Sequence, residues 1–291
     1  MKVVFHLGAH STDEDRIVGA LSSNERLLES HRIAVPAPRS YRMVLRDALV
    51  SLKGGPAPQD VQDAIIEAST EAPVLDRLVF SHAFFLCIPE RVITKRGFYA
   101  MAPGKLAPLA NLFPDAETEF HLALINPASL IPQLVARLPK RSYEQIMEGH
   151  DPRELRWDPL IRQMVEAAGG RRFVIWCNED LPLIWPEVLR SVGGLPEDQA
   201  LKGDMMVLRQ IMPEEGIERL RSYFDANPPK SVLHRRKIVA AFLDKYAQPE
   251  ALEIEAPLPG WTDELVDEIT AQYDADVAAI ARMPGVEFIA P

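Results

Sequence analysis

Four short apolar runs, separated by segments with helical periodicity, constrain the fold of this chain more than any other feature. The runs are Lys2–Gly8, Leu78–His82, Phe120–Ile125 and Arg172–Cys177. Each is a nearly continuous block of Val, Leu, Ile and Phe, which is typical of parallel strands that are covered on both faces. Strands that alternate with helices in this way predict an open parallel sheet. We therefore expect an α/β protein with three layers, in which helices cover both faces of the sheet.

The C-terminal third has a different character. From about Pro213 onward the pattern is mainly helical, and it includes a helix over Thr262–Ala281 and a short extension over Gly285–Ile289. Proline and glycine mark the breaks between elements, but no break is long enough or polar enough to be an interdomain linker. We therefore expect a single domain over residues 1–291.

Charge and cysteine content restrict the partners and the compartment. The net charge of −10 and the pI near 5.3 argue against nucleic acid or an anionic membrane as the main partner, since both would be repelled. Cys87 and Cys177 lie in apolar runs and are expected to be unpaired and buried, as in a reducing compartment. No run has the length of a transmembrane segment or the hydrophobic core of a signal peptide. These features together predict a soluble, cytoplasmic protein.

The turn after the first strand occupies the place where nucleotide-binding folds hold phosphate. Such a turn works through backbone N–H groups, the positive end of the following helix and a lysine that reaches the terminal phosphate. Here the sequence Gly8-Ala9-His10-Ser11-Thr12 supplies the first glycine, and Asp13, Glu14 and Asp15 follow it. A helix is expected over Asp13–Leu28. We expect the three carboxylates to exclude phosphate and sulfate from the helix end.

A local interpretation explains the acidic turn without any ligand. Ser11 with Glu14, or Thr12 with Asp15, fits a capping box, in which the hydroxyl and the carboxylate each accept a backbone N–H. Carboxylates in the first turn also stabilise the positive end of a helix by roughly 0.3–1 kcal/mol each. On this interpretation the protein itself fills the anion site.

The same turn resembles the opening of bacterial sulfotransferase-family proteins. In that family the pattern His-x-Gly-x-x-Lys-Thr-Gly-Thr-Thr binds the phosphosulfate end of 3′-phosphoadenosine 5′-phosphosulfate. His6, Gly8 and Thr12 match the pattern, whereas Ser11 stands in the place of the lysine. Asp13, Glu14 and Asp15 stand in the places of the glycine and the two threonines. The resemblance implies a P-loop fold in which Gly8, Ser11 and Thr12 are cofactor contacts of a degenerate nucleotide-binding loop.

Other segments extend this resemblance over most of the chain. Leu124–Pro127 with Ser129 is similar to the family's Leu-Arg-x-Pro segment, which implies that Asn126 and Ser129 lie at the 3′-phosphate site; Ile125 replaces the arginine. Three further segments are similar to the second strand, the fourth strand and the terminal helix of the family: Val79–His82, Trp176–Glu179 and Tyr273–Arg282.

Polar side chains are expected at the carboxyl ends of the strands, where open parallel sheets bind their ligands. They are His10, Asp13, Ser81, His82, Asn126 and Glu179. Histidines and carboxylates there can act as a general base or hold a divalent metal ion. The candidate catalytic residues are His10, His82 and Glu179. No motif ties the group together, and a hydrogen-bonded polar cluster without chemistry is the structural alternative. His6, inside the first strand, is expected to be a packed core histidine.

Three hypotheses for function follow. The first is a sulfotransferase-like protein that has lost ordinary 3′-phosphoadenosine 5′-phosphosulfate binding and binds, or acts on, a small polar ligand at the strand ends. The second is a non-catalytic binding or interaction module that keeps the fold as a scaffold. The third is a metal-dependent hydrolase or transferase that uses His10, Asp13, His82 and Glu179.

Overall fold

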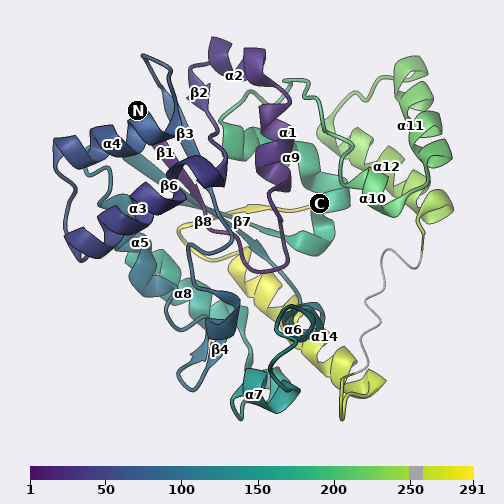
Figure 1. Cartoon of the computed structure of the whole chain (residues 1–291). Coiled ribbons are helices and arrows are strands. Elements are labelled where there is room, and N and C mark those ends of the chain that lie inside the picture. The colour runs from purple at the N-terminus through teal and green to yellow at the C-terminus, as the bar shows by residue number, and fades with distance from the viewer. Residues whose placement is uncertain (249–257) are drawn as a thin grey trace.

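The computed structural model describes residues 1–248 and 258–291, and its centre is a sheet of six parallel strands (Figure 1). The strand order is β2-β3-β1-β6-β7-β8, and every neighbouring pair is parallel. The strands are β1 (Lys2–His6), β2 (Ile33–Ala34), β3 (Arg77–Ser81), β6 (Glu117–Leu124), β7 (Arg172–Cys177) and β8 (Val286–Ile289). The predicted open parallel sheet is therefore confirmed, and each of the four apolar runs forms one of its strands.

Helices cover both faces of the sheet, because side chains alternate between the two faces along each strand. In β1, Val3 and Phe5 belong to one buried cluster, whereas Val4 belongs to the other. The first cluster is completed by α3 (Pro38–Leu52), α4 (Gln59–Ser69), α5 (Pro103–Ala110), α6 (Pro127–Arg137), α7 (Tyr143–Met147), α8 (Trp157–Ala168) and α14 (Asp263–Ile280). The second is completed by α1 (Arg16–Ser22), α2 (Glu25–Ser30) and α9 (Leu181–Gly193). These faces are the three layers that the sequence predicts.

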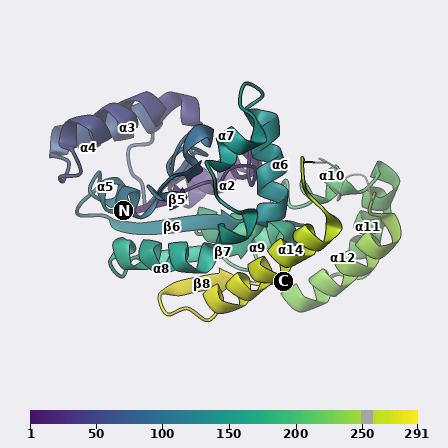
Figure 2. The ribbon, with the colours of Figure 1, turned by 90° about the horizontal axis from the view of Figure 1, so that it is seen from below.

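The C-terminal third is mainly helical, as predicted. α10 (Leu208–Ile211), α11 (Glu214–Ala226) and α12 (Val232–Tyr246) enclose a small apolar cluster of their own. Figure 2 shows these three helices gathered beyond one end of the sheet, away from α3 and α4. The predicted helix over Thr262–Ala281 is α14, with Thr262 as its N-cap.

Short elements complete the chain. An antiparallel hairpin, β4 (Ile93–Thr94) and β5 (Gly97–Phe98), lies between β3 and α5. Three single turns of 3₁₀ helix are η1 (Pro89–Arg91), η2 (Pro152–Glu154) and η3 (Asn178–Asp180).

The segment after β1 differs from the predicted helix over Asp13–Leu28. It divides into α1 and α2, and α1 begins only at Arg16. Neither capping box forms: the hydroxyl of Ser11 has no partner among the described residues, and Thr12 Oγ1 donates to the carbonyl of Ala9 at 2.7 Å. Asp13 caps the helix instead, since its Oδ1 accepts a hydrogen bond from the N–H of Ile17 at 2.9 Å.

The amino ends of the strands are joined by buried ion pairs. Glu119 on β6 is only 1% exposed and accepts from Arg77 on β3 at 2.6 Å and from Arg172 on β7 at 3.0 Å. Burial opposes the charge of Glu119, but hydrogen bonds from His121 and Arg77 hold the pKa of its carboxyl well below the ordinary value. This end of the sheet is therefore a closed structural network, and the opposite end is the place to look for a ligand.

Candidate functional site

A cavity of about 660 Å³ opens at the carboxyl ends of β1 and β3. β1 lies between β3 and β6, so the chain changes sides of β1 between these two strands. Such a switch point is where open α/β sheets bind ligands. The polar residues that line the cavity are His6, His10, Ser11, Asp13, Glu14, Asp15, Arg39, Arg42, Ser81, His82 and Arg137.

A tight loop between β1 and α1 forms one wall of the cavity. Gly8 has φ of +60°, and a Cβ atom added there would lie 2.8 Å from the Cα atom of Ala83 in the loop after β3. Only glycine allows these two backbones to approach so closely. Ser11, Glu14 and Asp15 also have positive φ, which turns the chain sharply back toward α1.

The three carboxylates of this loop have different surroundings. Asp13 is 9% exposed and holds the Ile17 N–H, one of the donors that an anion at the start of α1 would otherwise use. Glu14 forms an ion pair with Arg137 on α6. Asp15 makes no hydrogen bond or ion pair through its side chain with any other described residue. Of the three acidic side chains, Asp13 is the one that fills the anion position of the helix itself.

The backbone of the loop presents hydrogen-bond donors. Residues 10–12 form a hydrogen-bonded turn, and among the described residues no acceptor lies within hydrogen-bond geometry of the N–H groups of Gly8, Ala9, Ser11, Glu14 and Asp15. The His10 N–H donates to the hydroxyl of Tyr99 at 2.9 Å. Unpaired backbone donors are costly unless water or a ligand accepts from them. The cavity wall therefore combines free N–H groups with carboxylates.

His10 lies at the cavity and is held by Tyr99. Its Nδ1 is 2.9 Å from the Tyr99 hydroxyl, which has already accepted the His10 N–H and can donate its own proton to the ring. Nδ1 is then the acceptor, and the proton of the neutral ring is on Nε2. Burial, with a smaller contribution from Arg137, lowers the pKa of His10 to about 4. The imidazole is therefore neutral at pH 7, and its Nε2 has no hydrogen-bond partner among the described residues.

His82 and His6 line the same cavity. The Nδ1 of His82 accepts from the Phe84 N–H at 3.0 Å, and its pKa is lowered by burial and by Arg42. His6 is 1% exposed, and its Nδ1 lies 2.8 Å from Ser81 Oγ. Burial also lowers the pKa of His6. His6 is thus packed and hydrogen-bonded, as expected of a core histidine, and it also lines the cavity.

Glu179 and Asn126 lie apart from the cavity. Glu179 accepts from the Asn126 N–H at 2.8 Å and from the Tyr273 hydroxyl at 2.9 Å, which joins η3 to the start of α6 and to α14. The Asn126 side chain caps α6, because its Oδ1 accepts from the Ala128 N–H. Ser129, in the first turn of α6, and Thr12 are also absent from the cavity lining. Of the predicted catalytic and cofactor residues, His10, His82, Gly8 and Ser11 are the ones that the structure brings together.

Cationic residues of the cavity were not predicted from the sequence. Arg39 and Arg42 come from the first turns of α3, and Arg137 comes from the last turn of α6. The arginines of α3 make no ion pair within the part of the chain that the structure describes. One sequence signal was available, since Arg39 and Arg42 follow the helix-starting Pro38 at the spacing of one turn.

The third hypothesis depends on a metal ion. Within residues 1–248 and 258–291, no group of three or more His, Cys, Asp or Glu side chains is arranged to hold one.

Cys87 and Cys177 are unpaired and buried, and burial raises the pKa of each thiol to about 12. No described helix combines the length and the hydropathy that a membrane crossing requires.

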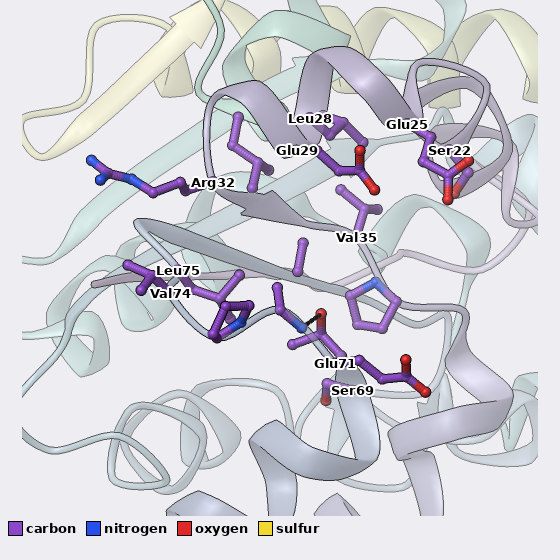
Figure 3. Close-up of a pocket in the computed structure, with 16 residues that line it drawn as sticks. Ser22, Glu25, Leu28, Glu29, Arg32, Val35, Ser69, Glu71, Val74 and Leu75 are labelled. Atoms are coloured by element: carbon purple, nitrogen blue, oxygen red, sulfur yellow. Dashed lines mark hydrogen bonds between the residues drawn. The ribbon is translucent and has the colours of Figure 1, made fainter.

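A larger cavity lies beside the edge strand β2 (Figure 3). It measures about 870 Å³ and lies between α2 and the segment that leads into β3. Leu28, Val35 and Val74 contribute apolar surface there, while Glu25 and Glu29 contribute carboxylates. None of the candidate catalytic or cofactor residues lines it, so the cavity at the strand ends is the better candidate site.

Comparisons with known proteins give a likeness in structure but none in sequence. No family model matches the chain, and no curated protein matches its sequence. Among solved structures, the chain is similar to a sulfotransferase from Alicyclobacillus acidocaldarius, with 14% sequence identity and a TM-score of 0.42. The match covers 82% of this chain and 97% of that protein.

Proposed function

We propose that this chain is a sulfotransferase-like α/β protein that does not use 3′-phosphoadenosine 5′-phosphosulfate and that binds a small polar ligand in the cavity at the strand ends. The observation that carries the proposal is the hydrogen bond that the Asp13 carboxylate accepts from the Ile17 N–H at the start of α1. A phosphate group would need that donor and would meet the charge of Asp13. No lysine lies in the loop to offset the repulsion.

The cavity walls carry cations, carboxylates and uncharged hydrogen-bond donors, and they favour a ligand that can bind to several of these. Arg39 and Arg42 on α3 offer cations, whereas Asp13 and Asp15 on the loop offer carboxylates. The free N–H groups of the loop add donors without charge. A small molecule that carries both hydrogen-bond acceptors and hydrogen-bond donors satisfies all three kinds of group.

His10 and His82 are the proposed hydrogen-bond donors to the ligand, and they would stabilise negative charge that develops on it if it reacts. Both line the cavity, and a lowered pKa keeps both rings neutral at pH 7. In each ring Nδ1 already accepts a hydrogen bond, so the ring proton is on Nε2. Glu179 has no place in this proposal, because its carboxylate binds Asn126 and Tyr273 outside the cavity. If no reaction occurs, the same cavity serves the second hypothesis, a binding module.

Calorimetric titration with 3′-phosphoadenosine 5′-phosphate tests the loss of the nucleotide site. The wild type should give no saturable heat at millimolar nucleotide, where a Kd of 1 mM corresponds to only about −4 kcal/mol. The combined variant Ser11→Lys, Asp13→Gly, Glu14→Thr and Asp15→Thr restores the family pattern and removes three carboxylates. It should gain submillimolar affinity, although Ile125 still leaves the 3′-phosphate without an arginine.

Asp13→Asn is the matched control. Its amide oxygen can still accept the Ile17 N–H, so the loop stays closed while one charge is removed. This variant should remain without nucleotide binding, because the lysine is still absent. Micromolar binding by the wild type would overturn the proposal. A combined variant that is folded by circular dichroism and binds nothing would count against the resemblance to sulfotransferases.

A further inference from the structure

A second cavity adjoins the site at the strand ends. It measures about 570 Å³ and lies between α3, the loop that follows β3, and α5. Arg42, His82 and Phe84 line both cavities, so the two open onto the same three side chains. We call this second cavity the α3–α5 groove. Its volume lies in the range of about 300–1,000 Å³ that is typical of sites for small ligands.

The groove gathers apolar side chains that are exposed to solvent. Met43 is 51% exposed, Val50 67%, Phe84 47% and Ile88 46%, and all four line the groove. They are four of the ten large hydrophobic side chains that are most exposed in the described part of the chain. Singly exposed apolar residues need no explanation, but a contiguous group in a concave surface marks a binding site. Further apolar lining comes from Leu45, Leu49, Phe85, Pro108 and Leu109.

The charged residues of the groove are all cations. Arg42, Arg46, Lys53 and Lys105 line it, and no Asp or Glu does. Arg42 and Arg46 fall on one stripe of α3, at the helical spacing of four residues, and Lys53 is the residue that ends this helix. None of the four makes a side-chain hydrogen bond or an ion pair with another described residue. In a protein with net charge −10, such a cluster is a local complement to an anion.

We propose that the α3–α5 groove binds the apolar chain of a single amphipathic anion, such as a fatty acid, whose acidic group is held by the cations of α3. The inference rests on the proposed function, because the cavity at the strand ends then receives the polar end of the same molecule. The shared residue Arg42 stands at the junction, where an acidic group and an apolar chain would meet.

A single small molecule fits these observations better than a membrane surface. The apolar residues line a concave groove of limited volume that continues into a polar cavity. A membrane-binding surface presents its apolar residues outward on a convex face and depends on a favourable overall charge. The net charge of −10 opposes contact with an anionic bilayer.

Titration with three probes below their critical micelle concentrations tests the proposal. Dodecanoate should bind the full chain with saturable heat. Dodecyltrimethylammonium has the same chain and the opposite charge, and it should bind at least about tenfold more weakly because four cations face it. Acetate has the charge without the chain and should show no binding, since burial of the chain supplies most of the affinity. Equal affinity for the two dodecyl probes would overturn the role of the cations.

Variants locate the binding. The double variant Arg46→Gln and Lys53→Gln should weaken dodecanoate by about fivefold or more, and Val50→Asp by about tenfold. Arg141→Gln and Val74→Asp are the matched controls, because both residues are exposed and lie outside the groove. They should leave dodecanoate affinity unchanged. The proposal would be overturned if all the groove variants bound dodecanoate with the affinity of the wild type.

Two further measurements separate the outcomes. Cosedimentation with phosphatidylserine and phosphatidylcholine vesicles should show no binding; vesicle binding that is lost in Val50→Asp, without dodecanoate binding, would replace the proposal with a membrane surface. If the wild type binds neither dodecanoate nor 3′-phosphoadenosine 5′-phosphate, the groove proposal is wrong and the proposed function is unaffected. If the wild type binds that nucleotide, the proposed function falls whatever dodecanoate does.

Discussion

At the scale of single residues, Asp13 shows how one side chain can replace a ligand. An exposed carboxylate at a helix start is commonly a weak stabiliser. Asp13 is almost buried, and its oxygen holds a backbone N–H that the geometry of the loop leaves without another partner. The structural role of Asp13 and its effect on anions therefore have the same origin.

We expect Asp13→Ala to lower the free energy of unfolding by about 1 kcal/mol, because the Ile17 N–H loses its acceptor. Asp13→Asn keeps an acceptor in place and should cost only a few tenths of a kcal/mol. Chemical denaturation measures both. Asp15→Ala is the control, since no hydrogen bond to the Asp15 side chain exists among the described residues. Equal losses for Asp13→Ala and Asp13→Asn would show that the charge of Asp13 matters to stability and its hydrogen bond does not.

At the scale of secondary-structure elements, Asp276 joins α14 to α8. It is 2% exposed and accepts from the Arg156 guanidinium at 2.5 and 3.0 Å. It also accepts from the Trp157 N–H at 2.8 Å, which caps the start of α8. Trp157 in turn donates from its indole to the carbonyl of Ile125, just beyond β6. A single carboxylate thus ties two helices to the end of a central strand.

Asp276→Ala should destabilise the chain by about 2–3 kcal/mol, because it leaves a buried N–H without a partner and breaks a hydrogen-bonded ion pair. Asp276→Asn retains one acceptor for Trp157 and should cost less. Asp274→Ala, on an exposed position of the same helix, is the control and should change stability by less than about 0.5 kcal/mol. Urea midpoints decide between these values. A loss below 1 kcal/mol for Asp276→Ala would mean that α14 is held by its apolar contacts alone.

Elements with strong local patterns were predictable from the sequence, and those without were not. Four strands are continuous apolar runs, so burial on both faces identifies them directly. β2 has only two residues, and β8 is partly exposed along its length. Neither β2 nor β8 carries a pattern that distinguishes a strand from a loop. β8 was recognised only as an extension over Gly285–Ile289.

The candidate site was predictable to the extent that strand ends define it. His82 directly follows β3, and His10 lies in the loop that follows β1, so the parallel arrangement brings them together. The partner of His10, Tyr99, lies 89 residues away in the sequence, next to a two-residue strand. Arg42 lies on a helix, where an arginine is usually solvated. Contacts of these kinds depend on tertiary packing and leave no local pattern.

At the scale of the whole molecule, buried histidines should make stability depend on pH. Burial lowers the pKa of His10 and His121 to about 4, and it also lowers the pKa of His6 and His82. The unfolded chain, with a histidine pKa near 6.5, therefore binds more protons than the folded chain below that pH. The stabilisation is complete above about pH 6.5, and it is lost as the pH falls from 6.5 toward 4.

Thermal unfolding at pH 7.5 and pH 5 measures this effect. The midpoint should fall sharply at pH 5, since His10 and His121 each remove roughly 2 kcal/mol between pH 7.5 and 5. His10→Asn keeps an acceptor for the Tyr99 hydroxyl and should make the fall smaller. His31→Gln, at an exposed position, should leave the fall unchanged. An identical pH dependence in His10→Asn and the wild type would show that His10 takes up no proton on unfolding.

Tyr41 anchors the helix that lies between the cavity at the strand ends and the α3–α5 groove. Its hydroxyl donates to the Ser81 carbonyl at 2.7 Å and accepts from the Ser81 N–H at 3.0 Å, so α3 is fixed to the last residue of β3. α3 carries both Arg42 at the cavity and Arg46 in the groove. One molecule that spans the cavity and the groove therefore contacts the same helix at both of its ends, and the motion of α3 is lost once for both sets of contacts. The polar group and the apolar chain, joined in one molecule, should then bind more tightly than the sum of their separate affinities.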